Sequence, residues 1–66
     1  MPRKFNSQQR RILAFKAGGK CSYCGIQLGN DFHADHIVPF SRGGLTLTSN
    51  GQALCAICNL KKGAHL

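Results

Sequence analysis

Two Cys-x-x-Cys pairs constrain the fold of this chain more than any other feature. The first pair is Cys21 and Cys24, and the second is Cys55 and Cys58, in a chain of 66 residues. A hydrophobic core of this size contributes only about 3–5 kcal/mol to folding stability, so disulfide bonds or a bound metal ion are expected to add to it. The four cysteines can form two disulfides or one metal site. The N-terminus carries no apolar run that could act as a secretory signal, which favours metal over disulfides.

Paired cysteines separated by a longer spacer are the ligand pattern of structural zinc sites. Four thiolates about 2.3 Å from Zn²⁺ complete its tetrahedral coordination and leave no open position for a substrate. We therefore assign this site a structural role. A thioredoxin-like redox function would require a βαβ setting, which a chain this short and Gly-rich does not offer.

A first helix is expected over residues 6–17. Asn6 or Ser7 can cap its start, and Gly18 with Gly19 can end it. The apolar residues expected to share one packed stripe are Phe5, Ile12 and Phe15.

The rest of the chain predicts two strands and a second helix. Residues 32–38 are expected to form a strand that ends before Pro39, which cannot donate to a strand ladder. A helical turn at 46–50 and an antiparallel strand at 52–55 follow. A final helix begins at Ala56 and ends near Gly63. The fold class is a small zinc-stabilised α+β domain.

The block between the cysteine pairs carries the candidate chemistry. The chain has two acidic residues, and one of them, Asp35, lies between His33 and His36. Asp35 is a hard oxygen ligand suited to Mg²⁺ or Mn²⁺, and Asn59 can bring an amide oxygen to the same ion. His36, with an ordinary pKa near ~6.5, is the natural general base. This arrangement fits phosphodiester hydrolysis, in which His33 can assist the metal or a phosphate.

In an ideal strand, successive side chains point to opposite faces, so Asp35 and His36 would diverge. For both to act on one substrate, the strand must twist or end near them. Pro39, close behind, is consistent with such an end.

The formal net charge is +7, from nine Lys and Arg against two acids. Four thiolates and one Zn²⁺ together carry −2, so the zinc-loaded chain has a charge of about +5. A basic surface suits a nucleic-acid partner, although it can also be a solvated face that keeps a small domain dispersed. The residues expected to hold phosphates beside the proposed site are Arg42, Lys61 and Lys62.

The order of these motifs resembles the HNH endonuclease family, in its small four-cysteine zinc branch. The matching elements are C-x-x-C, then D-H-I-V-P with a Ser-x-Gly-Gly loop, an Asn, and C-x-x-C-N-x-x-K-G, over about residues 20–63. The resemblance implies a ββα-metal (treble-clef-like) core at about 20–65, preceded by the N-terminal helix. The whole chain, 1–66, would then be a single HNH endonuclease domain.

The resemblance also implies roles for individual residues. His36 corresponds to the general base, and Asp35 to the adjacent metal ligand. Asn50 corresponds to the middle asparagine, which orients the loop and the base by hydrogen bonds. Asn59 takes the third position as a metal ligand, and Lys62 lies near the phosphates.

The chain departs from the family pattern at Gly51 and Ala53, where relatives carry larger apolar residues. The segment after Asn50 is therefore expected to be loosely packed. No separate targeting domain is present in the 66 residues, which argues against strong sequence specificity.

Two functions remain open at this point. The first is a metal-dependent DNA endonuclease that uses Mg²⁺, Mn²⁺ or Ni²⁺ and nicks with low sequence specificity, as a monomer or weak dimer. The second is a non-catalytic zinc module that binds nucleic acid or protein. No segment reaches the ~18 apolar residues of a membrane span, so we expect an intracellular protein without a membrane partner.

Overall fold

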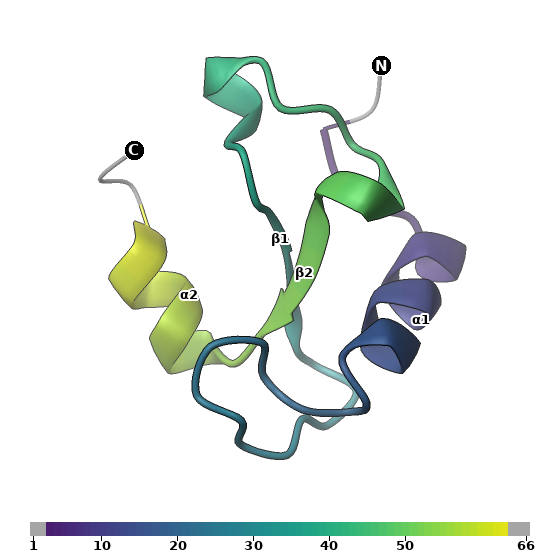
Figure 1. The fold of residues 1–66 in the computed structure, drawn as a ribbon, viewed down its shortest axis with the longest axis vertical. Coiled ribbons are helices and arrows are strands. Elements are labelled where there is room, and N and C mark those ends of the chain that lie inside the picture. The colour runs from purple at the N-terminus through teal and green to yellow at the C-terminus, as the bar shows by residue number, and fades with distance from the viewer. Residues whose placement is uncertain (1–2, 64–66) are drawn as a thin grey trace.

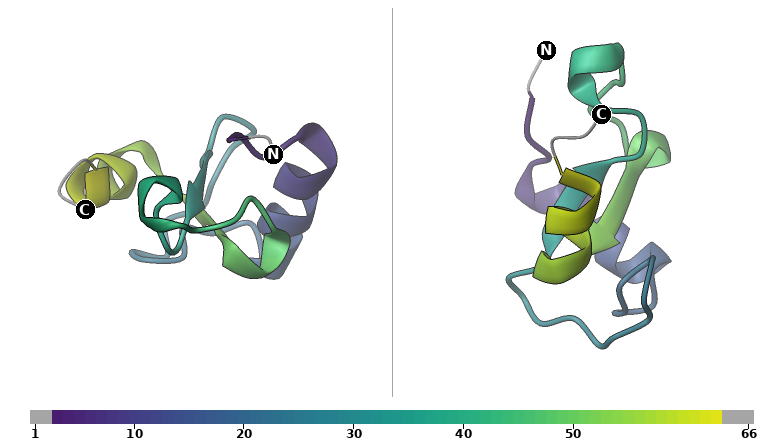
Figure 2. Two further views of the ribbon diagram at one scale, coloured as in Figure 1. Left: turned by 90° about the horizontal axis from the view of Figure 1, so that it is seen from above. Right: turned by 90° about the vertical axis from the view of Figure 1, so that its left-hand side faces the viewer.

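The structure, a computed structural model, describes residues 3–63. Its elements in chain order are helix α1 (Ser7–Lys16), strand β1 (His33–His36), the 3-10 turns η1 (Phe40–Arg42) and η2 (Thr48–Asn50), strand β2 (Gly51–Leu54) and helix α2 (Ala56–Lys62). The two strands stand at the centre, with α1 on one side and α2 on the other (Figure 1). The view from above shows the same separation (Figure 2, left). The expected α+β class, a ββα core with an added N-terminal helix, is confirmed.

The hairpin is antiparallel, with His33 opposite Leu54 and His36 opposite Gly51. Strand β1 is three residues shorter than the 32–38 expected from the sequence, whereas β2 has the expected length but lies one residue earlier than 52–55. His36 is the last paired residue of strand β1. Just beyond it, one more cross-strand hydrogen bond joins the Ile37 amide to the Asn50 carbonyl at 2.9 Å.

Helix α1 begins and ends as its sequence predicts. The Asn6 side chain accepts a hydrogen bond from the Gln9 amide at 2.8 Å, and the Gln9 side chain accepts one from the Asn6 amide at 2.9 Å. This reciprocal capping box satisfies two amides that a helix start leaves unpaired. After the C-cap Ala17, Gly18 and Gly19 take φ values of +65° and +74°. Glycine adopts this left-handed region without the steric cost that a Cβ brings.

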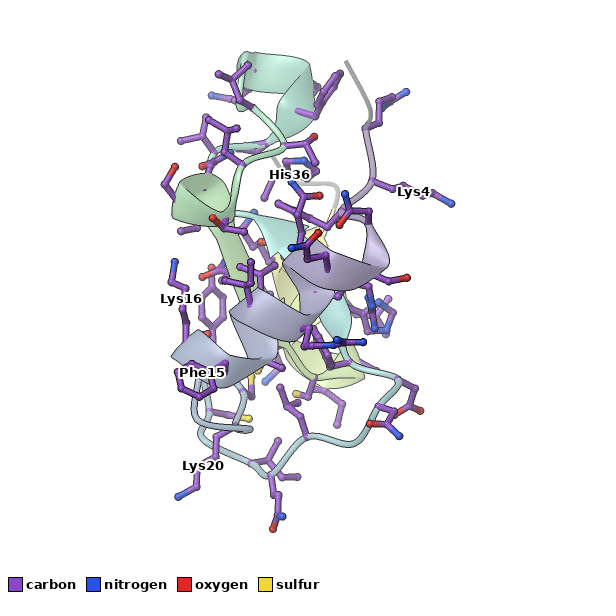
Figure 3. The ribbon with its side chains drawn as sticks, turned by 90° about the vertical axis from the view of Figure 1, so that its right-hand side faces the viewer. Lys4, Phe15, Lys16, Lys20 and His36 are labelled. Atoms are coloured by element: carbon purple, nitrogen blue, oxygen red, sulfur yellow. The ribbon has the colours of Figure 1, made fainter. Side chains whose placement is uncertain are left out.

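The apolar stripe predicted for α1 is wrong in part. Phe5 is buried as expected, but Ile12 is 41% exposed and Phe15 is 87% exposed, while Leu13 is 1% exposed. Successive helical residues are about 100° apart, so Phe15 lies roughly 200° around the helix from Leu13. Once Leu13 faces the hairpin, Phe15 must point to solvent, and Figure 3 shows it on the outer side of α1.

Helix α1 approaches the hairpin closely at Gly51. A Cβ atom at this position would lie 2.7 Å from Leu13 Cδ2 and 3.0 Å from Phe5 Cζ. Ala53 and Leu54, which follow in β2, are fully buried. The expectation of loose packing after Asn50 is therefore wrong, because the small residues admit the helix rather than leave a gap.

Replacing Gly51 by alanine is expected to destabilise the zinc-loaded domain by about 1–3 kcal/mol, as overpacking of a filled core does. A thermal melt should show this, since each kcal/mol lowers Tm by roughly 4–8 °C in a domain of this size. The matched control is Gly29→Ala, at an exposed position where the new methyl would meet only the Asp31 side chain, at 3.3 Å. Equal melting temperatures for the two variants would contradict the close approach of α1.

Within residues 3–63, no helix is long and apolar enough to cross a membrane. His65 and the last residues of the proposed 20–65 core lie outside the described part of the chain.

Candidate metal centre and active site

The four cysteines converge into one cluster. Their sulfur atoms all lie within 4.8 Å of one another, and all four are free thiols. Cys24 Sγ and Cys55 Sγ are 3.8 Å apart. Sulfurs placed ~2.3 Å from a central ion at tetrahedral angles would be separated by about 3.8 Å. The cluster is thus arranged to bind a metal ion, and four soft thiolates in this geometry suit zinc.

Local backbone geometry brings the two pairs together. The Gly25 amide donates to the Cys21 carbonyl at 3.0 Å, and Gly25 has a φ of +78°. The Ser22 amide donates to the Ala53 carbonyl at 2.9 Å, which fixes this turn to the end of β2. At the start of α2, the Cys58 amide lies 3.5 Å from Cys55 Sγ as a donor. The metal site therefore ties the hairpin and α2 to the first turn.

The thiols of the cluster differ in acidity. Burial raises the pKa of Cys58 to about 12, and hydrogen bonding to the other three cysteine thiols adds to this. Burial also raises the pKa of Cys21, but hydrogen bonds involving the backbones of Cys24, Cys55 and Tyr23 outweigh it and lower the pKa to about 6. At neutral pH the Cys58 thiol therefore favours its protonated form when no cation lies beside it.

His36, the last residue of β1, lies in a half-buried site on the side of the hairpin that faces the N-terminal segment. Its Nε2 is 2.9 Å from the hydroxyl of Thr46, and Thr46 is 4% exposed. The Thr46 carbonyl accepts a hydrogen bond from the Gln9 side chain at 3.0 Å. The imidazole packs against Phe5, with 4.6 Å between ring centroids, and against Phe40 at 5.9 Å. These contacts fix both the position and the orientation of the ring.

Asp35 points toward α2. Its Oδ2 lies 3.2 Å from the Lys62 ammonium and accepts a hydrogen bond from the Gln52 side chain at 2.9 Å. Gln52 is its cross-strand neighbour in the hairpin register. The same ammonium donates to the His36 carbonyl at 3.0 Å. The carboxylate therefore already holds a positive charge in a largely buried setting, with side-chain exposures of 10% for Lys62 and 16% for Asp35.

Asp35 and His36 thus face opposite sides of β1, as strand alternation requires. They are also the last two residues of the strand, and within residues 3–63 only one edge of β1 is paired. Asn59 lies on α2 three residues before Lys62, which makes the two side chains neighbours on the helix surface. In residues 3–63, only the cysteines form a metal-suited group of three or more His, Cys, Asp or Glu side chains.

Asn50 holds the loop that follows β1. Its Oδ1 accepts a hydrogen bond from the Val38 amide at 2.9 Å, and its Nδ2 donates to the carbonyls of Val38 at 3.1 Å and Leu45 at 2.9 Å. Gly44 is buried beside this clamp, where a methyl group would overlap the Val38 carbonyl oxygen. The side-chain contacts of Asn50 therefore fix the backbone just beyond His36.

The other candidate residues stand apart from this arrangement. His33, Arg42 and Lys61 are exposed. Within residues 3–63, none of their side chains takes part in a described hydrogen bond or ion pair. Arg42 ends η1, and Lys61 lies next to Lys62 on α2.

The sequence interpretation missed Thr46, Gln52 and the two phenylalanines around His36. The correct hairpin register would have found Gln52, because it lies directly opposite Asp35. Thr46 gave no local signal, since its contacts reach Gln9 and His36 across the fold.

Fold and site together define a ββα domain with a four-cysteine metal centre and a neighbouring Asp-His pair. A family model described as HNH endonuclease matches residues 21–65, most of the 66-residue chain. The chain belongs to the HNH endonuclease family, and nuclease activity is the class of function that this membership suggests. No curated protein and no solved structure gives a significant match.

Proposed function

We propose that this protein is a metal-dependent DNA endonuclease that hydrolyses phosphodiester bonds. The observation that carries the proposal is the end of β1. There, a histidine held by Thr46 follows directly on a carboxylate that already binds a cation, the Lys62 ammonium. A base beside a hard-metal ligand is the pair of groups that phosphodiester hydrolysis needs.

His36 is the general base in this proposal. The base function requires the tautomer in which Nε2–H donates to the Thr46 hydroxyl, 2.9 Å away, because the free lone pair then lies on Nδ1 and can take the proton from the attacking water. The rings of Phe5 and Phe40 hold the imidazole in place, so the base is oriented before substrate arrives. Asn50 acts indirectly, because its hydrogen bonds to the Val38 backbone fix the loop that follows the base.

Asp35 and Asn59 are the proposed ligands of a divalent ion, Mg²⁺, Mn²⁺ or Ni²⁺. The site at Asp35 fits a cation, because one oxygen of its carboxylate, Oδ2, already lies 3.2 Å from the Lys62 ammonium. When bound, such an ion supplies electrostatic stabilisation of the negative charge that develops on the phosphate and the departing oxygen. His33, an exposed residue of the same strand, is a further candidate to assist the metal or a phosphate.

Arg42 and Lys61, whose side chains are exposed, are the proposed contacts to DNA phosphates. Lys62 would join them once a metal ion takes the place of its ammonium at Asp35. Contacts of this kind carry no sequence information directly, so low sequence specificity is expected. One site cuts one strand, and a monomer would therefore nick. A double-strand break would need two sites or two successive events.

Replacing Thr46 by valine is expected to lower the cleavage rate about tenfold while the fold is kept. Valine has nearly the shape of threonine but leaves the half-buried imidazole nitrogen without its partner, a loss of about 1–3 kcal/mol. Thr46→Ser is the control, because it restores the hydroxyl, and its rate should return to within about threefold of the wild type. Equal rates for the valine and serine variants would contradict a positioning role.

Replacing Lys62 by methionine is expected to tighten Mn²⁺ binding about fivefold, because the ammonium no longer competes with the ion for Asp35. A fivefold change in affinity corresponds to the ~1 kcal/mol that an ion pair can contribute. Calorimetric titration of Mn²⁺ into the zinc-loaded protein measures it. Lys61→Met, next to Lys62 but exposed, is the matched control and should leave the Mn²⁺ affinity nearly unchanged. Weaker Mn²⁺ binding by the Lys62 variant would contradict the proposed place of the ion at Asp35.

The proposed activity is tested by incubating an end-labelled DNA duplex with the zinc-loaded protein and each of the three divalent metals in turn. Cleavage with at least one of them, and none without added metal, is expected. An intact duplex under all three conditions would contradict the endonuclease proposal.

A further inference from the structure

A pocket of about 490 Å³ lies where the N-terminal segment, α1 and β1 meet. Its basic lining residues are Arg3, Lys4, Arg10, His33 and His36. Such a volume is within the range of small-ligand sites. The pocket is on the side of β1 to which His36 points, away from the Asp35–Lys62 pair.

The N-terminal part of the pocket is anchored in the core. Phe5 is 7% exposed and packs against the His36 ring, which fixes the chain next to Lys4. The Arg3 guanidinium lies over the Phe40 ring, 5.2 Å from its centroid. Two aromatic contacts therefore hold this basic segment against the end of the hairpin.

The opposite wall is also preorganised. The Arg10 guanidinium donates to the Phe32 carbonyl at 2.8 Å and to the Asn30 carbonyl at 3.3 Å. It also lies over the Phe32 ring, 4.3 Å from the centroid. None of these partners carries a negative charge, so the positive charge of Arg10 is not neutralised.

The charge of the pocket is uncompensated. The chain has two acidic residues, and neither lines the pocket. One of them, Asp35, is paired with Lys62 on the other face of β1. Three permanently charged side chains in one concave site attract an anion, and arginine and lysine are the usual protein partners of phosphate.

We infer that this pocket binds a phosphate of the DNA backbone next to the bond that is cut. The inference deepens the proposed function and rests on it. His36 forms part of the pocket wall and would stand between the phosphate in the pocket and the phosphate whose bond is cut. Arg3 and Lys4 hold the neighbouring phosphate, and Arg10 gives the wall a fixed positive charge. The N-terminal segment thereby becomes part of the substrate site, in addition to the loop and α2 residues named above.

The test compares two lysines that each lose one charge. Lys4 and Lys20 lie toward opposite ends of the molecule, and both are exposed (Figure 3). The binding of a fluorescent DNA duplex is measured by anisotropy for Lys4→Gln and Lys20→Gln, with the protein zinc-loaded and no other divalent metal present. Lys4→Gln should weaken binding about fivefold and reduce the salt slope by about 0.9, the value for one lost phosphate contact. Lys20→Gln should change the affinity less than about twofold.

Arg3→Gln should weaken DNA binding as Lys4→Gln does, because both side chains line the pocket. Arg11→Gln should change the affinity as little as Lys20→Gln does, because Arg11 is exposed on α1 outside the pocket. Equal losses for pocket and control variants would show general charge attraction only and would overturn the inference. The measurement does not depend on cleavage, so it separates the two proposals. An inactive wild type with pocket-specific binding would refute the endonuclease alone, while an active wild type with equal losses would refute the pocket alone.

Discussion

Replacing Cys58 by serine is expected to remove the metal and unfold the domain. Cys58 is 9% exposed and belongs to the small buried cluster around Leu54 and Cys21, so the metal site is also part of the core. Structural zinc contributes about 10–16 kcal/mol of apparent binding energy in zinc-finger peptides, far more than a core of this size supplies. Metal content, measured by mass spectrometry, and helical content, measured by circular dichroism, should both fall far below those of the wild type.

Ser22→Ala is the control for this prediction. Ser22 lies in the same turn as Cys21 and is exposed, and its described contact is made by its backbone amide. This variant should keep one zinc ion per chain and its fold. A well-folded, metal-free Cys58→Ser protein would contradict the coupling between metal and fold.

Replacing His36 by alanine is expected to lower the cleavage rate by about 10²–10⁴, the usual contribution of a general base. Because the ring is half-buried between Phe5 and Phe40, alanine also leaves a cavity that can weaken the fold. His36→Gln is therefore made beside it, since glutamine fills much of the space and offers the Thr46 hydroxyl a polar partner. Rates are measured under single-turnover conditions with saturating metal.

Both His36 variants should lose cleavage, and the glutamine variant should keep its zinc content and thermal stability. Loss in alanine alone, with near wild-type cleavage in glutamine, would indicate that the ring supports packing rather than proton transfer.

The features that the sequence predicts well depend on local chemistry. The two Cys-x-x-Cys turns, the Asn6 cap and the glycines after α1 each act within a few residues, so their sequence pattern is sufficient. The hairpin follows from the strand pattern and from Pro39, and α2 begins at Ala56 and ends at Gly63 as its sequence indicates. Family resemblance added the order of these parts, and the family match confirms it.

The features that the sequence predicts poorly depend on contacts between distant segments. Phe15 and Leu13 are both apolar residues of α1, and only the approach of the helix to Gly51 decides which one is buried. The Thr46 hydroxyl reaches His36 across a ten-residue separation whose path the sequence does not specify. The pairing of Asp35 with Lys62 likewise depends on where α2 packs.

The measurement that tests the central claim most directly is the conversion of supercoiled plasmid by the zinc-loaded protein, with and without Mg²⁺ or Mn²⁺, beside His36→Gln. We expect metal-dependent conversion to open circle by the wild type and no conversion by the variant. A plasmid that the wild type binds but leaves supercoiled in both metals would contradict the account. The protein would then be a non-catalytic zinc module for which the Asp35–His36 pair needs another explanation.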